Sequence, residues 1–180
     1  MRELALNILD IVENSVKANA TLIEIGVSAK DNLLTVSVKD NGKGMSEEFL
    51  SKVTDPYTTT RTTRKVGLGL PLLKMEAEMC GGRFSISSKL GVGTIVATDF
   101  QIDHIDRPPL GDLGETMSTL LSGEDNVDYV LTYSVNDVGF TLDTRELKAE
   151  LDGVPISEPE VLLFVKNYIR ENISQIGGLL

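Results

Sequence analysis

The hydrophobic repeat changes abruptly within the first forty residues, and this change restricts the fold more than any other feature. Over residues 3–18 polar and apolar side chains occupy opposite arcs of a helical wheel, which predicts an amphipathic helix. Residues 21–28 and 33–40 instead read as two strands joined by a turn at Asp31-Asn32. The chain is therefore expected to begin with a helix and a β-hairpin. The polar arc of the helix holds Glu3, Asn7, Asp10, Glu13, Asn14 and Lys17, and the apolar arc holds Ile8, Leu9, Ile11, Val12 and Val16.

The second predicted strand ends on a carboxylate at an unexpected position. Leu34, Val36, Val38 and Asp40 share one face by the two-residue period of a strand, so Asp40 extends a core-facing row. Burying a carboxylate costs free energy unless a donor meets it. Asp40 is therefore predicted either to accept a hydrogen bond from a bound group or to form the Asx-turn that is common for Asp-Asn-Gly.

The rest of the chain predicts further helices and strands. Ser46 is expected to cap a short helix, Pro71 lies near a helix start, and Gly81-Gly82 end that helix. Pro108-Pro109 are interpreted as a linker. The predicted elements are helices at 47–53, from about 71 to 80, at 112–122 and at 158–174, and strands at 83–88, 94–101, 127–135 and 138–143, the last two joined at Asn136-Asp137.

One surface of the final predicted helix is apolar, which is more often core than an oligomer interface. Its members are Val161, Leu162, Phe164, Val165, Tyr168 and Ile169.

Composition and charge narrow the classes of function. No apolar run approaches the ~20 residues of a membrane span, and a single cysteine, Cys80, fits a reducing cytoplasm. With one cysteine and one histidine, His104, a Cys/His zinc site within one chain is not expected. Residues 1–100 hold 12 acids and 12 bases, whereas residues 101–180 hold 15 acids and 5 bases, which accounts for the net charge of −10. This acidic part argues against nucleic-acid binding and would suit a basic protein partner, although solubility alone also explains it.

Three glycine-rich stretches follow one another: Asp40-Asn41-Gly42-Lys43-Gly44, Gly67-Leu68-Gly69 and Gly91-Val92-Gly93-Thr94. Any of them could be a turn. Gly67 and Gly69 are the most suggestive, because they lie between a basic loop, residues 54–66, and a helix start. Glycine leaves the backbone N–H groups at a helix N-terminus open to bind phosphate. Positive charge nearby comes from Arg61, Arg64 and Lys65.

Asp10 and Asn14 are four residues apart, so they lie one above the other on the first helix. A carboxylate over an amide can position a water or a hydroxyl group and can hold Mg²⁺ through oxygen ligands. The alternative is a solvated helix face.

Taken together, the ENS of the first helix, then DNGKGM, VGLGL and GVGT, closely resemble the GHKL family of ATP-binding domains over roughly residues 1–100. Its members include sensor histidine kinases, anti-sigma-factor serine kinases, gyrase, heat-shock chaperone ATPases and MutL. The resemblance implies an α+β fold: a two-layer α/β sandwich, the Bergerat fold, with a mixed sheet covered by helices on one face. Two parts are expected, an ATP-binding domain at 1–103 and an acidic α/β domain at 104–180 for docking, dimerisation or regulation.

The resemblance also implies roles for individual residues. Asn14 is expected to bind Mg²⁺ between the phosphates, and Asp40 to accept a hydrogen bond from the adenine amino group. Gly42 and Gly44 would admit adenine, Gly67 and Gly69 would contact phosphates, and residues 54–66 would form the ATP lid. Thr94 would support Asp40 through water. The expected nucleotide-binding set is completed by Lys17, Met45, Thr59, Arg64, Lys65, Leu68 and Leu70.

The general base of the family, four residues before the Asn, corresponds to Asp10, with Glu13 as second candidate. Hydrolytic members have Glu there, so the shorter Asp10 favours phosphotransfer or switching over hydrolysis. The helical hairpin with an acceptor histidine is not expected before a first motif that begins at residue 10, and His104 is not expected to be a phosphoacceptor. We therefore expect a cytoplasmic Mg-ATP-binding protein kinase acting on a separate protein. The alternatives are an ATP-dependent switch in a larger complex or a slow ATPase, with no nucleic acid or membrane as partner and a homodimer left open.

Overall fold

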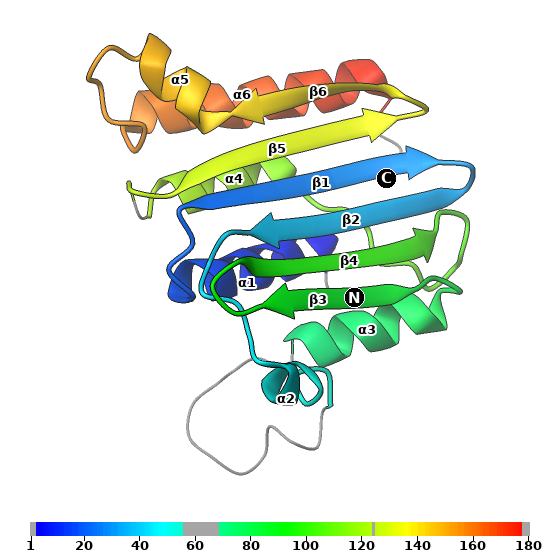
Figure 1. The fold of residues 1–180 in the computed structure, drawn as a ribbon. Helices are drawn as coiled ribbons and strands as arrows, with labels where there is room; N and C mark the ends of the chain where they lie inside the picture. Colours follow the sequence, from blue (N-terminus) through cyan, green and yellow to red (C-terminus); the bar gives the residue numbers. More distant parts are fainter. Residues whose placement is uncertain (1–2, 56–68, 124, 178–180) are drawn as a thin grey trace.

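A computed structural model describes residues 3–55, 69–123 and 125–177. Two layers make up the fold, a six-stranded sheet and a layer of helices packed on one of its faces (Figure 1). The strands are β1 (Leu22–Lys30), β2 (Leu33–Asp40), β3 (Phe84–Lys89), β4 (Gly93–Gln101), β5 (Asp128–Val135) and β6 (Val138–Asp143). The helices are α1 (Leu4–Lys17), α2 (Glu47–Leu50), α3 (Gly69–Met79), α4 (Leu113–Leu121), α5 (Thr144–Glu150) and α6 (Pro159–Ile176).

The strand order is β3-β4-β2-β1-β5-β6, and every pair is antiparallel except β1 with β5. The sheet is therefore mixed, as expected for the α+β sandwich with helices on one face, and this prediction is confirmed. The turns at Asp31-Asn32 and Asn136-Asp137 are also confirmed, and all four residues have positive φ angles between 49° and 67°. Asn and Asp tolerate this left-handed conformation, which two-residue hairpins require.

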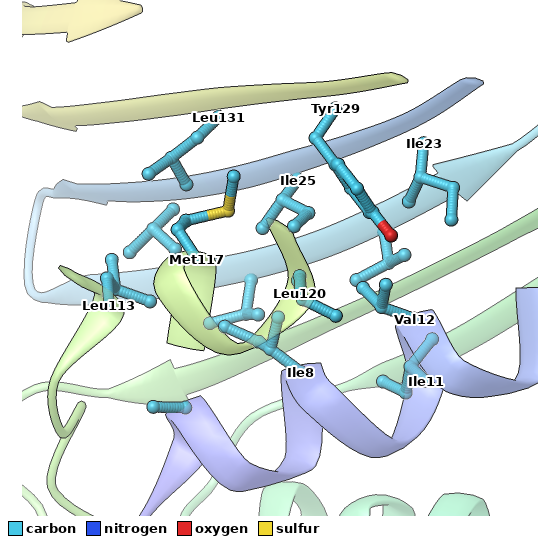
Figure 2. Close-up of a cluster of buried hydrophobic side chains, with 14 of the residues drawn as sticks. Ile8, Ile11, Val12, Ile23, Ile25, Leu113, Met117, Leu120, Tyr129 and Leu131 are labelled. Carbon is cyan, nitrogen blue, oxygen red and sulfur yellow. The ribbon is translucent and has the colours of Figure 1, made fainter. Parts of the chain in front are cut away.

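The acidic C-terminal part adds its strands to the same sheet. β5 pairs with β1 from Leu22↔Asp128 to Ala29↔Val135, and β6 then forms the sheet edge. Figure 2 shows α4 and β5 packed together with α1 and β1 in one core, with Ile8, Ile25, Met117 and Tyr129 among the buried side chains. The division at 103/104 stays a prediction, and the two predicted parts share one sheet and one hydrophobic core.

The segment interpreted as a linker is bound to the first helix, so that interpretation is wrong. Pro108 is buried, and the carbonyls of Pro109 and Leu110 accept from the N–H groups of Leu4 and Ala5 at 2.9 and 2.8 Å. These two N–H groups belong to the first turn of α1, where a helix leaves its donors without internal partners. The segment therefore caps α1 with backbone carbonyls.

Two helices differ from the expectation. α2 ends at Leu50 rather than 53, although Ser46 does cap it by accepting from the N–H of Phe49. α5 was not predicted; it begins after Asp143, whose Oδ1 accepts from the N–H of Arg145 at 2.9 Å. The signal was the Asp-Thr-Arg-Glu sequence, an N-cap residue with acid in the first turn.

α6 buries Val161, Val165 and Ile169, as predicted for part of its apolar face. Phe164 differs, because it is 56% exposed and stacks on the half-buried Tyr168. Within the described ranges, no helix is both long enough and apolar enough to cross a membrane.

Candidate functional site

α1 carries four of the predicted site residues on its polar side. Asp10 is half-buried, whereas Glu13, Asn14 and Lys17 are exposed. Asn7, from the same polar arc, is instead buried, and its Nδ2 donates to Oε2 of Glu76 on α3 at 3.2 Å. One part of the arc therefore faces solvent, and the part nearer the start of the helix packs against α3.

The Asp40 carboxylate lies at the end of β2 and meets two donors. Its Oδ2 accepts from the hydroxyl of Ser15 at 2.7 Å, and its Oδ1 accepts from the N–H of Gly42 at 2.8 Å. The second bond is the Asx-turn expected as an alternative. The first ties the end of β2 to α1 next to Asn14. Both donors leave the carboxylate as an acceptor, with lone pairs remaining on each oxygen.

The glycines after Asp40 allow close approach of protein backbone. A Cβ on Gly42 would lie 2.8 Å from the carbonyl oxygen of Ala18 at the end of α1. Gly44 has a φ of 68°, and a Cβ there would lie 2.0 Å from the carbonyl oxygen of Lys89. These contacts give a structural reason for both glycines, and their contact with adenine stays a prediction.

Thr94 lies directly across from Asp40 in the β2–β4 register. Its hydroxyl is 2.8 Å from the hydroxyl of Ser88, which also accepts from the N–H of the half-buried Met45 at 2.8 Å. The structure therefore places Thr94 beside Asp40 and gives its hydroxyl a protein partner. Water-mediated support of Asp40 stays a prediction.

α3 begins beside Asp10. A Cβ on Gly69 would lie 3.5 Å from Oδ2 of Asp10, so this carboxylate is in contact range of the first residue of the helix. Gly69 and Leu70 are both half-buried. The helix N-terminus predicted to bind phosphate and the predicted base are therefore neighbours. Thr59, Arg64, Lys65, Gly67 and Leu68, with most of the predicted lid, lie outside the described residues.

Sequence reasoning missed Ser15 and Ser88. Ser15 is 3% exposed and shares the buried side of α1 with Ile8 and Ile11. A hydroxyl in an apolar stripe can be detected in a sequence, and so can a carboxylate on a core-facing row. Here the two signals belong to one hydrogen-bonded pair, Ser15 and Asp40. Ser88 carried no comparable signal, since half-buried serines in an edge strand are ordinary.

A hollow of about 310 Å³ also lies near the end of β2. Its lining includes Ile95 and the Lys39–Glu24 ion pair of 2.7 Å. Lys39 alternates with Asp40 along β2, so these side chains lie on the sheet face opposite α1. Among the described residues, no group of three or more His, Cys, Asp or Glu side chains is arranged to hold a metal ion.

Comparison with known proteins identifies the class. Residues 2–104 match the model of the histidine kinase-, DNA gyrase B-, and HSP90-like ATPase family. A putative NtrY-like sensor histidine kinase of Rickettsia conorii is 30% identical over 107 residues, which cover 59% of this chain and 18% of that protein. The histidine protein kinase DivJ of Caulobacter vibrioides is 34% identical over 102 residues, which cover 53% of this chain and 17% of that protein.

Among solved structures, the N-terminal domain of a DNA repair protein superposes with a TM-score of 0.54 at 14% identity. The match covers 79% of this chain and 52% of that one, and it supports the fold alone. The chain spans less than a fifth of the length of the two kinases it matches. It belongs to the histidine kinase-, DNA gyrase B-, and HSP90-like ATPase family, and within it the curated relatives named above are histidine kinases.

Proposed function

We propose that this chain binds Mg-ATP between α1, the end of β2 and the start of α3. The observation that carries the proposal is the Asp40 carboxylate, held as an acceptor by Ser15 and Gly42 at the end of a core-facing row. An acceptor there matches the donor that adenine presents in its exocyclic amine. The family membership supports the same assignment.

The residues present fit the rest of the nucleotide. The side chain of Asn14 is exposed beside Ser15, and an amide oxygen is a suitable ligand for Mg²⁺. The N-terminus of α3 at Gly69 would receive phosphate oxygens through its backbone N–H groups. Bound Mg²⁺ would neutralise charge on the phosphates.

We further propose that the γ-phosphoryl group passes to a separate protein. The nucleophile of that protein would form the new bond to phosphorus while the bond to the β-phosphate oxygen breaks and ADP leaves. Asp10 would receive the proton of the nucleophile, because it is half-buried and lies beside the start of α3. Its side chain is shorter than the Glu of hydrolytic relatives, which favours transfer over hydrolysis.

A second candidate is an ATP-controlled switch, favoured by the attachment of α1. The helix that carries Asn14 is capped by the carbonyls of Pro109 and Leu110 and packs against α4. A change in α1 on nucleotide binding would therefore reach the C-terminal part directly.

The fate of the γ-phosphate tests both candidates. The protein and its Asp10→Asn variant are incubated with Mg²⁺ and γ-labelled ATP, alone and in a lysate of their own cells. Label on a partner protein that is lost with Asp10→Asn supports the kinase. Tight ATP binding without transferred label or released phosphate supports the switch, and Asp10→Asn would then leave nucleotide-dependent partner binding intact. Absence of ATP binding would contradict both.

A further inference from the structure

A second hollow lies far from the proposed nucleotide site, between the end of α5 and the start of α6. It has a volume of about 560 Å³ and is lined by Asp152, Gly153, Val154, Pro155, Glu158, Glu160 and Val161. We call these residues the acidic hollow. In Figure 1 the turn between α5 and α6 lies at the β6 edge of the sheet, whereas α2 and α3 lie at the β3 edge. The acidic hollow is therefore a separate surface.

Part of the wall of the acidic hollow is apolar. Val154 is 50% exposed and Val161 is buried, with Pro155 between them in the chain. One turn along α6 from the hollow, Leu163 and Phe164 are 57% and 56% exposed. Exposed apolar side chains are thus also present on α6.

The rim of the acidic hollow is negative. In the described part of the protein, the side chains of Asp152, Glu158 and Glu160 have no hydrogen-bond or ion-pair partner, and all three residues are exposed.

Each of the five basic side chains of residues 101–180 has a partner outside the acidic hollow. Arg145 pairs with Asp143, Lys148 with Asp128, Lys166 with Glu115 and Arg170 with Asp112, and Arg107 donates to the carbonyls of Ile102 and Pro108.

We propose that the acidic hollow docks a segment of a partner protein that carries lysine or arginine beside apolar side chains. Its cationic groups would lie against the three carboxylates, and its apolar groups or aliphatic stems would cover Val154, Pro155 and Val161. An acidic surface repels a second copy of itself, so charge favours a basic partner over a dimer through this surface. The inference is independent of nucleotide binding.

The test uses the full chain without nucleotide and three labelled peptides: alternating lysine and leucine, alternating lysine and glycine, and alternating glutamine and leucine. The lysine–leucine peptide is expected to bind most tightly at physiological salt, because it alone supplies both charge and apolar area. The triple variant Asp152→Asn/Glu158→Gln/Glu160→Gln is expected to weaken it by roughly tenfold, the effect of a few exposed ion pairs.

The matched control is Asp31→Asn/Glu47→Gln/Glu78→Gln, which removes the same charge from exposed positions elsewhere. It is expected to bind the lysine–leucine peptide like the unaltered chain, and thermal melting verifies that both variants are folded. Val154→Ser is expected to weaken the lysine–leucine peptide but not the lysine–glycine peptide. Equal losses in the two triple variants, or equal binding of the two lysine peptides, would show general charge attraction and overturn the proposal. Absence of binding at physiological salt would also overturn it.

Discussion

The hydroxyl of Ser15 and the carboxylate of Asp40 each interrupt an otherwise apolar row, one on a helix and one on a strand. Their 2.7 Å hydrogen bond satisfies two polar groups at once and joins α1 to the end of β2. A pair of this kind positions the carboxylate, because the donor comes from a different element. Ser15 is therefore a positioning residue for the proposed adenine contact.

Substitutions of Asp40 and Ser15 distinguish the residue proposed to contact adenine from the residue that positions it. Asp40→Asn is expected to weaken ATP binding roughly 10- to 100-fold, because hydrogen bonds to a charged group contribute about 1.5–3 kcal/mol. Ser15→Ala is expected to weaken binding less, since Gly42 still holds the other oxygen of Asp40. Calorimetric titration with ATP measures both. Asp137→Asn, in the β5–β6 turn, is the control, and unchanged affinity in Asp40→Asn would remove the adenine assignment.

One side chain, Asp112, forms hydrogen bonds with both α4 and α6. Asp112 caps α4 by accepting from the N–H of Glu115 at 3.0 Å, and it also accepts from Nε of Arg170 on α6 at 2.9 Å. The Arg170 hydrogen bond is the main reason why the pKa of Asp112 is lowered from its ordinary value of 3.8, with burial opposing it. The contact between α4 and α6 therefore depends in part on the negative charge of Asp112.

The lowered pKa sets the direction of the pH dependence. The contribution of an Asp with a depressed folded-state pKa is present above its unfolded-state value and is lost as pH falls through the folded-state value. Asp112→Ala is expected to lower the free energy of unfolding by about 1–2 kcal/mol at neutral pH, the typical loss of an N-cap. Asp112→Asn keeps a capping side chain, so it should cost less at neutral pH and reduce the loss of stability as pH falls through and below the ordinary Asp pKa of 3.8. Urea unfolding measures both, and identical acid profiles for Asp112→Asn and the unaltered chain would contradict the assignment.

Elements with a strong local signal were predictable from sequence. The helical wheel of α1 and the Asp-Asn and Asn-Asp hairpin turns depend on neighbouring residues, and all of them are observed. The position of Asp40 on a core-facing row was also visible, whereas its Ser15 partner required knowing how α1 packs on β2. α5 was missed because a seven-residue helix has little periodicity to detect.

The connection between the two halves was the least predictable feature of the whole molecule. Nothing local to Leu22–Lys30 indicates that its second neighbour is Asp128–Val135, because strand pairing at long range leaves no periodic trace. The proline pair was interpreted as a linker for the same reason, since its carbonyls bond to a helix start distant in sequence.

The shared sheet predicts that residues 1–103 do not fold stably alone. Without the rest of the chain, the β1 edge and the core side chains covered by α4 and β5 would face water. The fragment is expected to lack a cooperative thermal transition and to self-associate, as measured by circular dichroism and analytical ultracentrifugation. A monomeric fragment with a cooperative transition would instead support an independent domain ending at 103.

The pairing of β1 with β5 also has a consequence during synthesis. A ribosome translates from the N-terminus, so β1 emerges long before the strand that covers its open side. Until β5 has been released, the nascent chain exposes an unpaired strand edge and apolar surface, which are the features that chaperones recognise and that drive aggregation. The distance in sequence between the two strands also makes their pairing a slow step, because a long loop must close before the contact is gained. The sheet can therefore be completed only after the C-terminal part of the chain has been synthesised.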